Sequence, residues 1–158
     1  MYLSYLKYVL RHKYFVFLSC CHYRLFWRGI IHDWSKFLPD EFIPYAKHFY
    51  GGINKGKDGK GYYKAEDTNV DPAFDLAWLK HQRRNKHHYQ WWVLSTDEEG
   101  IKVLEMPLQY RQEMVADWRG AGRAQGTPDT ARWYQAHKGD ILLGDDTRKW
   151  VEHELGLN

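Results

Sequence analysis

Residues 2–24 constrain the fold most, because apolar side chains recur there at helical spacing and neither Gly nor Pro interrupts them. The most apolar part, YFVFLSCC at 14–21, is far shorter than the roughly 20 residues that a membrane span needs. Basic residues surround it, namely Lys7, Arg11, Lys13 and Arg24. We therefore predict a long buried helix and no membrane segment.

The rest of the chain also divides into helices separated by turn residues. The further predicted helices cover 30–36, 40–49, 71–94, 108–126, 128–143 and 145–156, with turns at 27–29 and 95–100. Asp40 and Asp71 are typical of helix starts, Gly126 of a helix end, and cap residues precede the last two helices. The Gly-rich stretch 51–70 is predicted to be a flexible loop insertion. We expect one all-α domain, a helical bundle over residues 1–158.

Composition narrows the range of partners. The net charge of +3 suits an anionic small molecule but falls short of the dense basic stripe of a duplex-binding protein. Cys20 and Cys21 are neighbours, which predicts neither a disulfide nor a zinc knuckle and favours a reducing cytoplasm. Aromatic residues make up 17% of the chain. We expect the tryptophans to build the core, with a base-stacking platform as the alternative, and they leave a homodimer open.

The stretch IIHDWSKF at 30–37 places His32 directly before Asp33, with Lys36 one helical turn later. This arrangement fits a helix start with an aspartate near its positive end, or the corner of a metal site. Imidazole and carboxylate groups together suit borderline divalent metals such as Mn, Fe, Co, Ni and Zn.

Further histidines lie in the predicted helix 71–94. His81, Asn85 and His88 are spaced i, i+4 and i+7 and would share one face, whereas His87 would point elsewhere and serve in packing or at the surface. His81 and His88 could each hold one ion of a pair, or one could ligate while the other handles protons.

Asp117 is followed one turn later by the small residues Gly120 and Ala121. Small side chains beside a carboxylate leave room for a ligand or allow a second helix to pack closely. On its own, Gly120 favours helix packing.

Taken in chain order, these residues resemble the pattern of the HD-domain superfamily of metal-dependent phosphohydrolases. The matching residues are His12, His32, Asp33, His81, His88 and Asp117. HDWSK at 32–36 is similar to the HDxxK variant of two-metal branches, in which the lysine contacts the substrate phosphate. LKHQRRNKHHYQWW at 79–92 and ADWRGAGR at 116–123 look similar to an uncharacterised branch of small phage and bacterial proteins. The resemblance covers most of residues 2–155 apart from the loop.

Two features depart from the superfamily pattern. The gap from His12 to His32 is short, and His22 is an alternative first ligand. Lys36 stands at the third position after the doublet, where single-metal nucleotidases of the superfamily often carry an acidic residue. This second departure favours two ions.

The resemblance implies a helical HD-like domain that hydrolyses a nucleotide or another small phosphoester by means of a metal-activated water. The expected ligands are His12, His32, Asp33 and Asp117 for one ion, and His81 and His88 for the other. The expected catalytic residues are Asp33, Lys36 and Glu41, with Glu41 orienting a ligand or shuttling a proton. The expected substrate contacts are Lys36, Arg84, Asn85, Arg119 and Arg123. Two alternatives remain: a mixed-valent di-iron oxygenase of the same fold, and a non-catalytic module that binds or sequesters a nucleotide.

Overall fold

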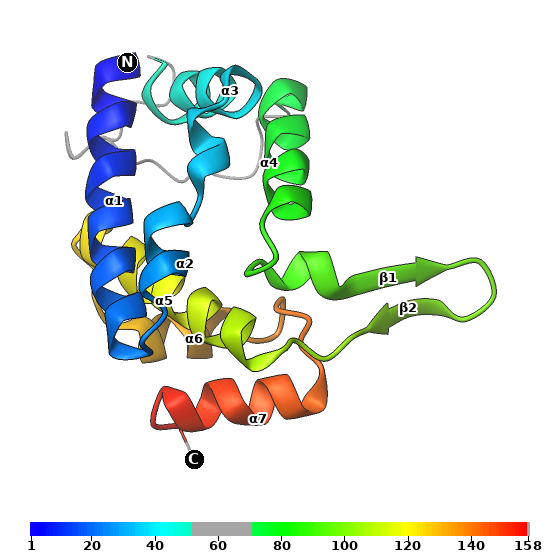
Figure 1. Cartoon of the computed structure of the whole chain (residues 1–158). Coiled ribbons are helices and arrows are strands. Elements are labelled where there is room, and N and C mark those ends of the chain that lie inside the picture. Colours follow the sequence, from blue (N-terminus) through cyan, green and yellow to red (C-terminus); the bar gives the residue numbers. More distant parts are fainter. Residues whose placement is uncertain (52–70, 158) are drawn as a thin grey trace.

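The computed structural model describes residues 1–51 and 71–157, so the predicted Gly-rich loop lies almost wholly outside the described residues. Figure 1 shows a mostly helical chain with one small sheet, which confirms the predicted all-α class. The helices are α1 (Tyr2–His22), α2 (Phe26–Ile31), α3 (Pro39–Tyr50), α4 (Pro72–Arg84), α5 (Leu108–Gln125), α6 (Thr130–His137) and α7 (Asp145–Glu154). The 3₁₀ segments are η1 (Trp34–Phe37) and η2 (Tyr89–Trp92). Strands β1 (Val93–Thr96) and β2 (Gly100–Val103) pair antiparallel. Within the described ranges, every helix is too short or too polar to cross a bilayer.

Helices α1 and α5 pack against each other along much of their length, and α2 and α3 lie beside α1 (Figure 1). The buried residues of α1 are Tyr5, Val9, His12, Val16, Ser19 and Cys20. Gly120 of α5 makes the close approach possible, because a Cβ there would lie 2.4 Å from Cγ2 of Val16. This contact confirms that Gly120 serves helix packing. The pairing brings His12 of α1 and Asp117 of α5 to the same place.

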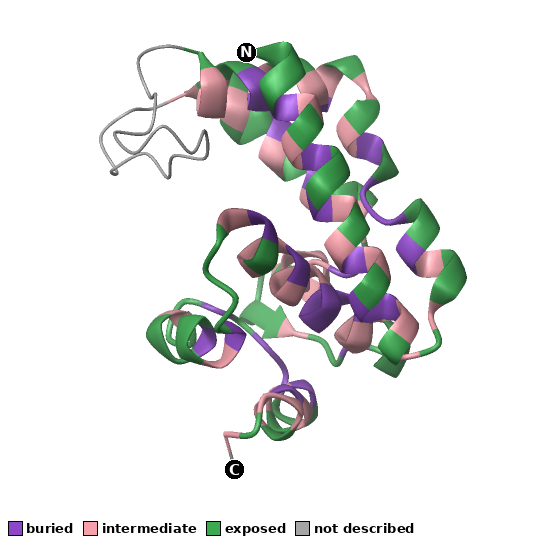
Figure 2. Ribbon diagram, turned by 90° about the vertical axis from the view of Figure 1, so that its left-hand side faces the viewer, coloured by how far each residue is buried: buried purple, intermediate pink, exposed green. Residues whose placement is uncertain are grey.

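The buried apolar residues form two main clusters on either side of this helix pair. One cluster joins α1, α3 and α4 through Tyr5, Val9, Tyr45, Ala46 and Ala77. The other joins α5, α6, α7 and the segments between them through Met106, Met114, Val115, Tyr134, Ile141, Leu143 and Val151. Figure 2 shows the buried residues where helices face one another and exposed residues on the outside. Trp92, Trp118 and Trp150 pack against the second cluster, which confirms their core role, whereas the Trp133 side chain is 39% exposed.

The region around the His-Asp doublet differs from the prediction. Residues 27–29 belong to α2 and form no turn, and the predicted helix 30–36 is wrong because α2 ends at Ile31. His32 is extended, and Asp33 has a left-handed backbone with a φ of 51° before η1 begins. Aspartate tolerates this conformation better than most residues. The doublet therefore sits on a sharp turn between two short helices, where neighbouring side chains can point to one place.

Helix α4 is shorter than predicted. It begins at Pro72, with the Asp71 side chain accepting a hydrogen bond from the Phe74 amide, but it ends at Arg84 and does not continue to residue 94. Asn85 is extended, and its side-chain amide donates to the His81 carbonyl at 2.8 Å. The residues after η2 instead form β1, which pairs with β2 across the predicted turn 95–100.

Helix caps agree with the prediction only in part. Gly126 ends α5 with a φ of 80°, and Asp129 caps α6 by accepting from the Arg132 amide. Asp40 is wrong as a cap, because α3 already begins at Pro39. The cap of α7 comes from far away in the chain: Glu105 accepts hydrogen bonds from the amides of residues 146 and 147.

Candidate metal centre

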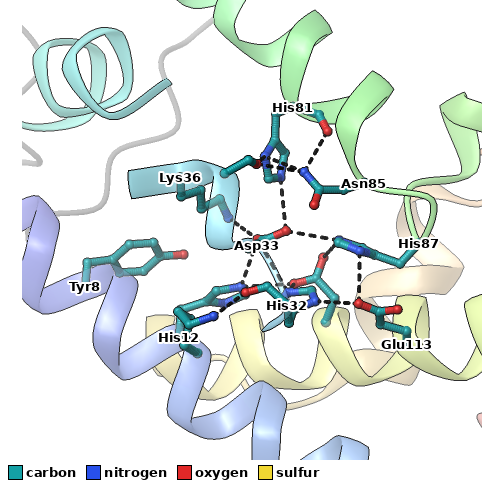
Figure 3. A network of polar contacts seen from close by, with 12 residues as sticks. Tyr8, His12, His32, Asp33, Lys36, His81, Asn85, His87 and Glu113 are labelled. Carbon is teal, nitrogen blue, oxygen red and sulfur yellow. Dashed lines mark hydrogen bonds and ion pairs between the residues drawn. The ribbon is translucent and has the colours of Figure 1, made fainter. Parts of the chain in front are cut away.

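Asp33 lies at the centre of a buried polar cluster (Figure 3). Its Oδ2 atom is 2.6 Å from Lys36 Nζ and 3.4 Å from His32 Nε2. Its Oδ1 atom faces another direction, at 3.4 Å from His81 Nε2 and 3.3 Å from His87 Nε2. The two oxygens of one carboxylate therefore face two different groups of histidines.

The first group brings together three distant segments of the chain. It consists of His12 from α1, His32 and Asp33 from the turn after α2, and Asp117 from α5. His12 Nε2 is 3.1 Å from Asp117 Oδ1 and 3.6 Å from Asp33 Oδ2. His32 Nε2 is 3.3 Å from the same Asp117 oxygen. We refer to these four residues as the first ligand set.

The second group forms at the end of α4. It consists of Asp33, His81, His87 and His88, whose ligand atoms all lie within 4.8 Å of one another. Because α4 ends at Arg84, the chain at 85–88 turns back and brings two more histidines beside His81. We refer to these four residues as the second ligand set, which shares Asp33 with the first.

The hydrogen bonds and the spacing of the ligand atoms in the two sets are typical of a site for metal ions. Asp33 Oδ2 forms an ion pair with Lys36, but within the described part of the chain no hydrogen-bond partner is found for Asp33 Oδ1 or for the Nε2 atoms of His12, His81, His87 and His88. The separations of 3.1–3.6 Å between donors match the ~3.0–3.4 Å edges of octahedra and tetrahedra built with metal–ligand bonds of about 2.1 Å. Buried polar atoms without hydrogen bonds are costly, and a bound cation would satisfy them.

The opposite ring nitrogens of three histidines are held by carboxylates. Glu41 lies 2.9 Å from His81 Nδ1, and Glu113 lies 3.1 Å from His32 Nδ1 and 3.4 Å from His87 Nδ1. This pattern is typical of metal-binding histidines, because the carboxylate fixes the tautomer and aims the free nitrogen at the ion. Glu113 lies one turn before Asp117 on α5, and this i, i+4 spacing was the available sequence signal for a residue that the prediction missed.

The cluster is also electrostatically prepared for a cation. Arg28 pairs with Glu113 at 3.0 Å, Arg84 with Glu41 at 2.7 Å, and Lys36 with Asp33 at 2.6 Å, whereas the ion-pair partners of Asp117 are histidines. Burial alone would raise the pKa of Asp33, but His32 and Lys36 hold it well below its usual value. Burial would likewise raise the pKa of Asp117, but His12 and His32, at 3.1 and 3.3 Å from its Oδ1 atom, outweigh this and lower it strongly. Two ionised carboxylates in a buried site attract positive charge.

The structure brings together all six predicted metal ligands, corrects the expectation for His87, and places His12 rather than the alternative His22 at the cluster. His87 was expected to point away, yet its side chain is 2% exposed and it joins the second ligand set, because the helix on which that expectation rested ends before it. His22 lies exposed at the last residue of α1 and belongs to neither set, so His12 is the residue on α1 that faces the cluster.

The predicted substrate contacts are placed differently. Arg84 pairs with Asp40 and Glu41, and Arg119 donates to the Tyr23 hydroxyl and to the backbone carbonyl of Glu154. The Asn85 side chain donates to Ser35 Oγ at 3.0 Å as well as to the His81 carbonyl, and Arg123 is exposed. Glu41 is buried and holds His81. Five of the predicted catalytic or substrate-contact residues therefore lie outside the lining of the cavity beside the cluster, namely Glu41, Arg84, Asn85, Arg119 and Arg123.

Lys36 is the predicted substrate contact that does reach this cavity. Its side chain is 13% exposed, and it lines a space of about 780 Å³ together with His12, His88 and Asp117. Burial alone would lower the pKa of Lys36, but Asp33 raises it well above its usual value, so the ammonium group stays charged. The cavity is thus lined by residues of both ligand sets and by one positively charged side chain.

Fold and site together define an all-α protein with a buried His/Asp cluster that could hold metal ions. Residues 1–157 match a family of unknown function, DUF5662, and the chain belongs to this family. Comparisons with curated proteins and with solved structures give no match.

Proposed function

We propose that this protein is a metal-dependent phosphohydrolase with a two-ion centre that acts on a nucleotide or another small phosphoester. The observation that carries the proposal is the placement of Asp33, whose two oxygens face two separate ligand sets. One bridging carboxylate between two groups of histidines suits a pair of divalent ions. The residue order that resembles the HD-domain superfamily supports the same chemistry.

In this proposal, the first ion is held by His12, His32, Asp33 and Asp117, and the second by Asp33, His81, His87 and His88. Divalent ions in such a centre polarise a phosphoryl oxygen and lower the pKa of a bound water. Imidazole with carboxylate favours Mn, Fe, Co, Ni or Zn. Glu41 and Glu113 keep the ring nitrogens aimed at the ions, so the ligands are oriented before any ion arrives.

The residues of the chain have further roles in this proposal. Lys36 reaches the cavity beside Asp33 and would neutralise a phosphoryl oxygen as negative charge develops in the transition state. Aromatic side chains line much of the cavity, and a substrate bound against them would displace water and so strengthen this interaction. Glu41 acts as a positioning residue for His81 in this scheme.

The decisive test is reconstitution of the purified protein with each candidate metal, followed by incubation with a broad panel of nucleotides and phosphoesters. Metal content is measured by mass spectrometry, and released phosphate is measured in parallel. We expect two ions per chain and phosphate release that falls by orders of magnitude in Asp117→Asn. Asp97→Asn, at an exposed aspartate of the turn between β1 and β2 that lies outside both ligand sets and the cavity, is the matched control.

Two results would replace the proposal. Tight binding of iron with oxygen uptake and no phosphate release would favour the di-iron oxygenase. Stoichiometric nucleotide binding without any product would favour a sequestering module.

A further inference from the structure

The cavity beside the first ligand set extends away from it along helices α1 and α5. On α5, Asp117, Ala121 and Gln125 line it on successive turns, which corresponds to about 12 Å at 1.5 Å per residue. On α1, Tyr5 and His12 span about 10 Å in the same way. Ala121, one turn after Asp117, adds only a small side chain next to the carboxylate. The volume of about 780 Å³ is in the range of pockets that enclose small molecules.

The walls of this cavity are rich in aromatic rings. Trp78 of α4 lies over the metal end, with its ring centroid 5.3 Å from that of His88. Trp118 and Trp133 line the cavity from α5 and α6, with centroids 5.3 Å apart. Trp133 stacks on His137 with centroids 5.0 Å apart, and 39% of the residue remains exposed. The two indole rings are tilted at 56° to each other, and together they give the cavity wall an aromatic surface on which a planar ring can stack.

The charges of the cavity are unequal along its length. Among the described residues that line it, Lys36 is the one lysine or arginine, and it lies at the metal end. Asp75 and Asp140 also line the cavity, and Asp75 precedes His81 by six residues, or about 9 Å along α4. The two proposed ions and Lys36 place the positive charge at that one end, so the outer phosphates of a triphosphate would extend past it toward two further carboxylates. One phosphoryl group matches this distribution.

We propose that the cavity takes a phosphomonoester whose alcohol carries an aromatic ring, with the phosphoryl group at Lys36 and the ring beside Trp118 and Trp133. A nucleoside monophosphate has this composition and a length that suits the cavity. This inference rests on the proposed function, because it places the phosphoryl group at the metal centre. It deepens that function by excluding polyphosphates and phosphoesters without a ring.

Binding to the metal-reconstituted full chain tests the inference without relying on turnover. The probes are a slowly hydrolysed phosphorothioate of a nucleoside monophosphate, a nucleoside triphosphate, and ribose 5-phosphate, which has no ring. Titration calorimetry gives the affinities. We expect the nucleoside monophosphorothioate to bind at least tenfold more tightly than either of the others.

Two tryptophan variants show where the ring binds. Trp133→Leu, which changes a partly exposed cavity residue, should weaken binding of the nucleoside monophosphorothioate about fivefold or more. Trp27→Leu is the matched control, since Trp27 is 71% exposed and does not line the cavity. Equal affinity for the triphosphate or for ribose 5-phosphate would overturn the inference, as would unchanged binding in Trp133→Leu.

This experiment separates failure of the inference from failure of the proposed function. Tight binding of the nucleoside monophosphorothioate with no phosphate release from the matching phosphate ester would support the cavity assignment and refute the hydrolase. Phosphate release from triphosphates or ring-free esters at equal or higher efficiency would support the hydrolase and refute the cavity assignment.

Discussion

Helix α5 contributes to two buried regions of opposite character. Met114 and Val115 join the apolar cluster between α5, α6 and α7, whereas Glu113 and Asp117 join the polar cluster around Asp33. In the apolar cluster, burial of hydrocarbon stabilises the fold without any other molecule. In the polar cluster, several buried atoms lack a hydrogen bond among the described residues, including the Nε2 atoms of His12, His81, His87 and His88.

The two regions therefore contribute differently to stability and to metal binding. Burying polar atoms without hydrogen bonds lowers the stability of the free protein, so the polar cluster is a poor source of folding energy. A bound cation would remove that cost, whereas the apolar cluster needs no partner. Substitutions in the polar cluster should therefore change metal binding most, and substitutions in the apolar cluster should change the free energy of unfolding most.

The largest effect is expected for Asp33→Asn. Because its two oxygens face both ligand sets, this change should remove both ions and abolish phosphate release, while Asp117→Asn should remove only the ion of the first set. Metal content by mass spectrometry distinguishes the two variants. If folded Asp33→Asn still bound two ions, the Asp33 carboxylate would not be a ligand shared by the two sets.

Met106→Ala tests the opposite region. Met106 is 1% exposed within the apolar cluster, so the cavity left behind should lower the free energy of unfolding by about 2–5 kcal/mol. Urea titration measures this loss. Metal content per folded chain should stay the same, and a parallel loss of metal would contradict the separation of the two regions.

Gly120→Ala should affect both regions at once. The added Cβ would lie 2.4 Å from Val16 Cγ2 and would push α1 away from α5, lowering the free energy of unfolding by about 1–3 kcal/mol. Metal affinity of the first ligand set should fall as well, since His12 and Asp117 lie on these two helices. Gly139→Ala, where nothing lies within 4 Å of an added Cβ, is the matched control. Equal stability of the two variants would argue against this packing.

Glu113→Gln should weaken metal binding by about 10–100-fold without unfolding the protein. Glu113 holds the Nδ1 atoms of His32 and His87, and although burial opposes it, these contacts lower the pKa of the carboxyl to about 2. Competition with a chelator measures the affinity. Glu98→Gln, at an exposed residue of the β1–β2 turn, should change nothing, and the same affinity in both variants would rule out a positioning role.

The smallest effect concerns Glu105, which caps α7. Burial would raise its pKa, but hydrogen bonds from Thr147 and from the Asp146 amide lower it below the ordinary 4.5. Because the folded pKa is the lower one, the stabilisation is complete above about pH 4.5 and is lost as the pH falls through the folded value. The Tm of Glu105→Gln should lie below that of the wild type at pH 7, and the gap should shrink below pH 4.5. A gap independent of pH would exclude the carboxylate charge as its cause.

Much of the fold could be predicted because its signals are local. The apolar spacing of residues 2–24 predicts α1 to within two residues, and Gly126 predicts the end of α5. The end of α4 could not be predicted, since nothing in the spacing of 71–94 interrupts a helix. There, the Asn85 side chain bonds back to the His81 carbonyl, and residues 93–96 gain strand partners at 100–103.

The candidate site, like the fold, could be predicted from the sequence only in part. The chemical types and their order, from His12 through the doublet at 32–33 to Asp117, were visible in the chain and predicted which residues gather. The position of His87 was not visible, because it depends on where a helix ends. The pairing of Arg119 with Tyr23 and Glu154 was also hidden, because it joins α5 to residues far away in the chain.

The sequence by itself determined the helical class of this protein and the set of imidazole and carboxylate groups available to it. Only the tertiary structure decided which histidines meet which oxygen of Asp33, which arginines are already paired, and which side chains surround the cavity. The physical reason is distance along the chain. Helix periodicity acts over a few residues, whereas the contacts among residues 12, 33, 81, 87 and 117 exist only after α1, α4 and α5 have packed together.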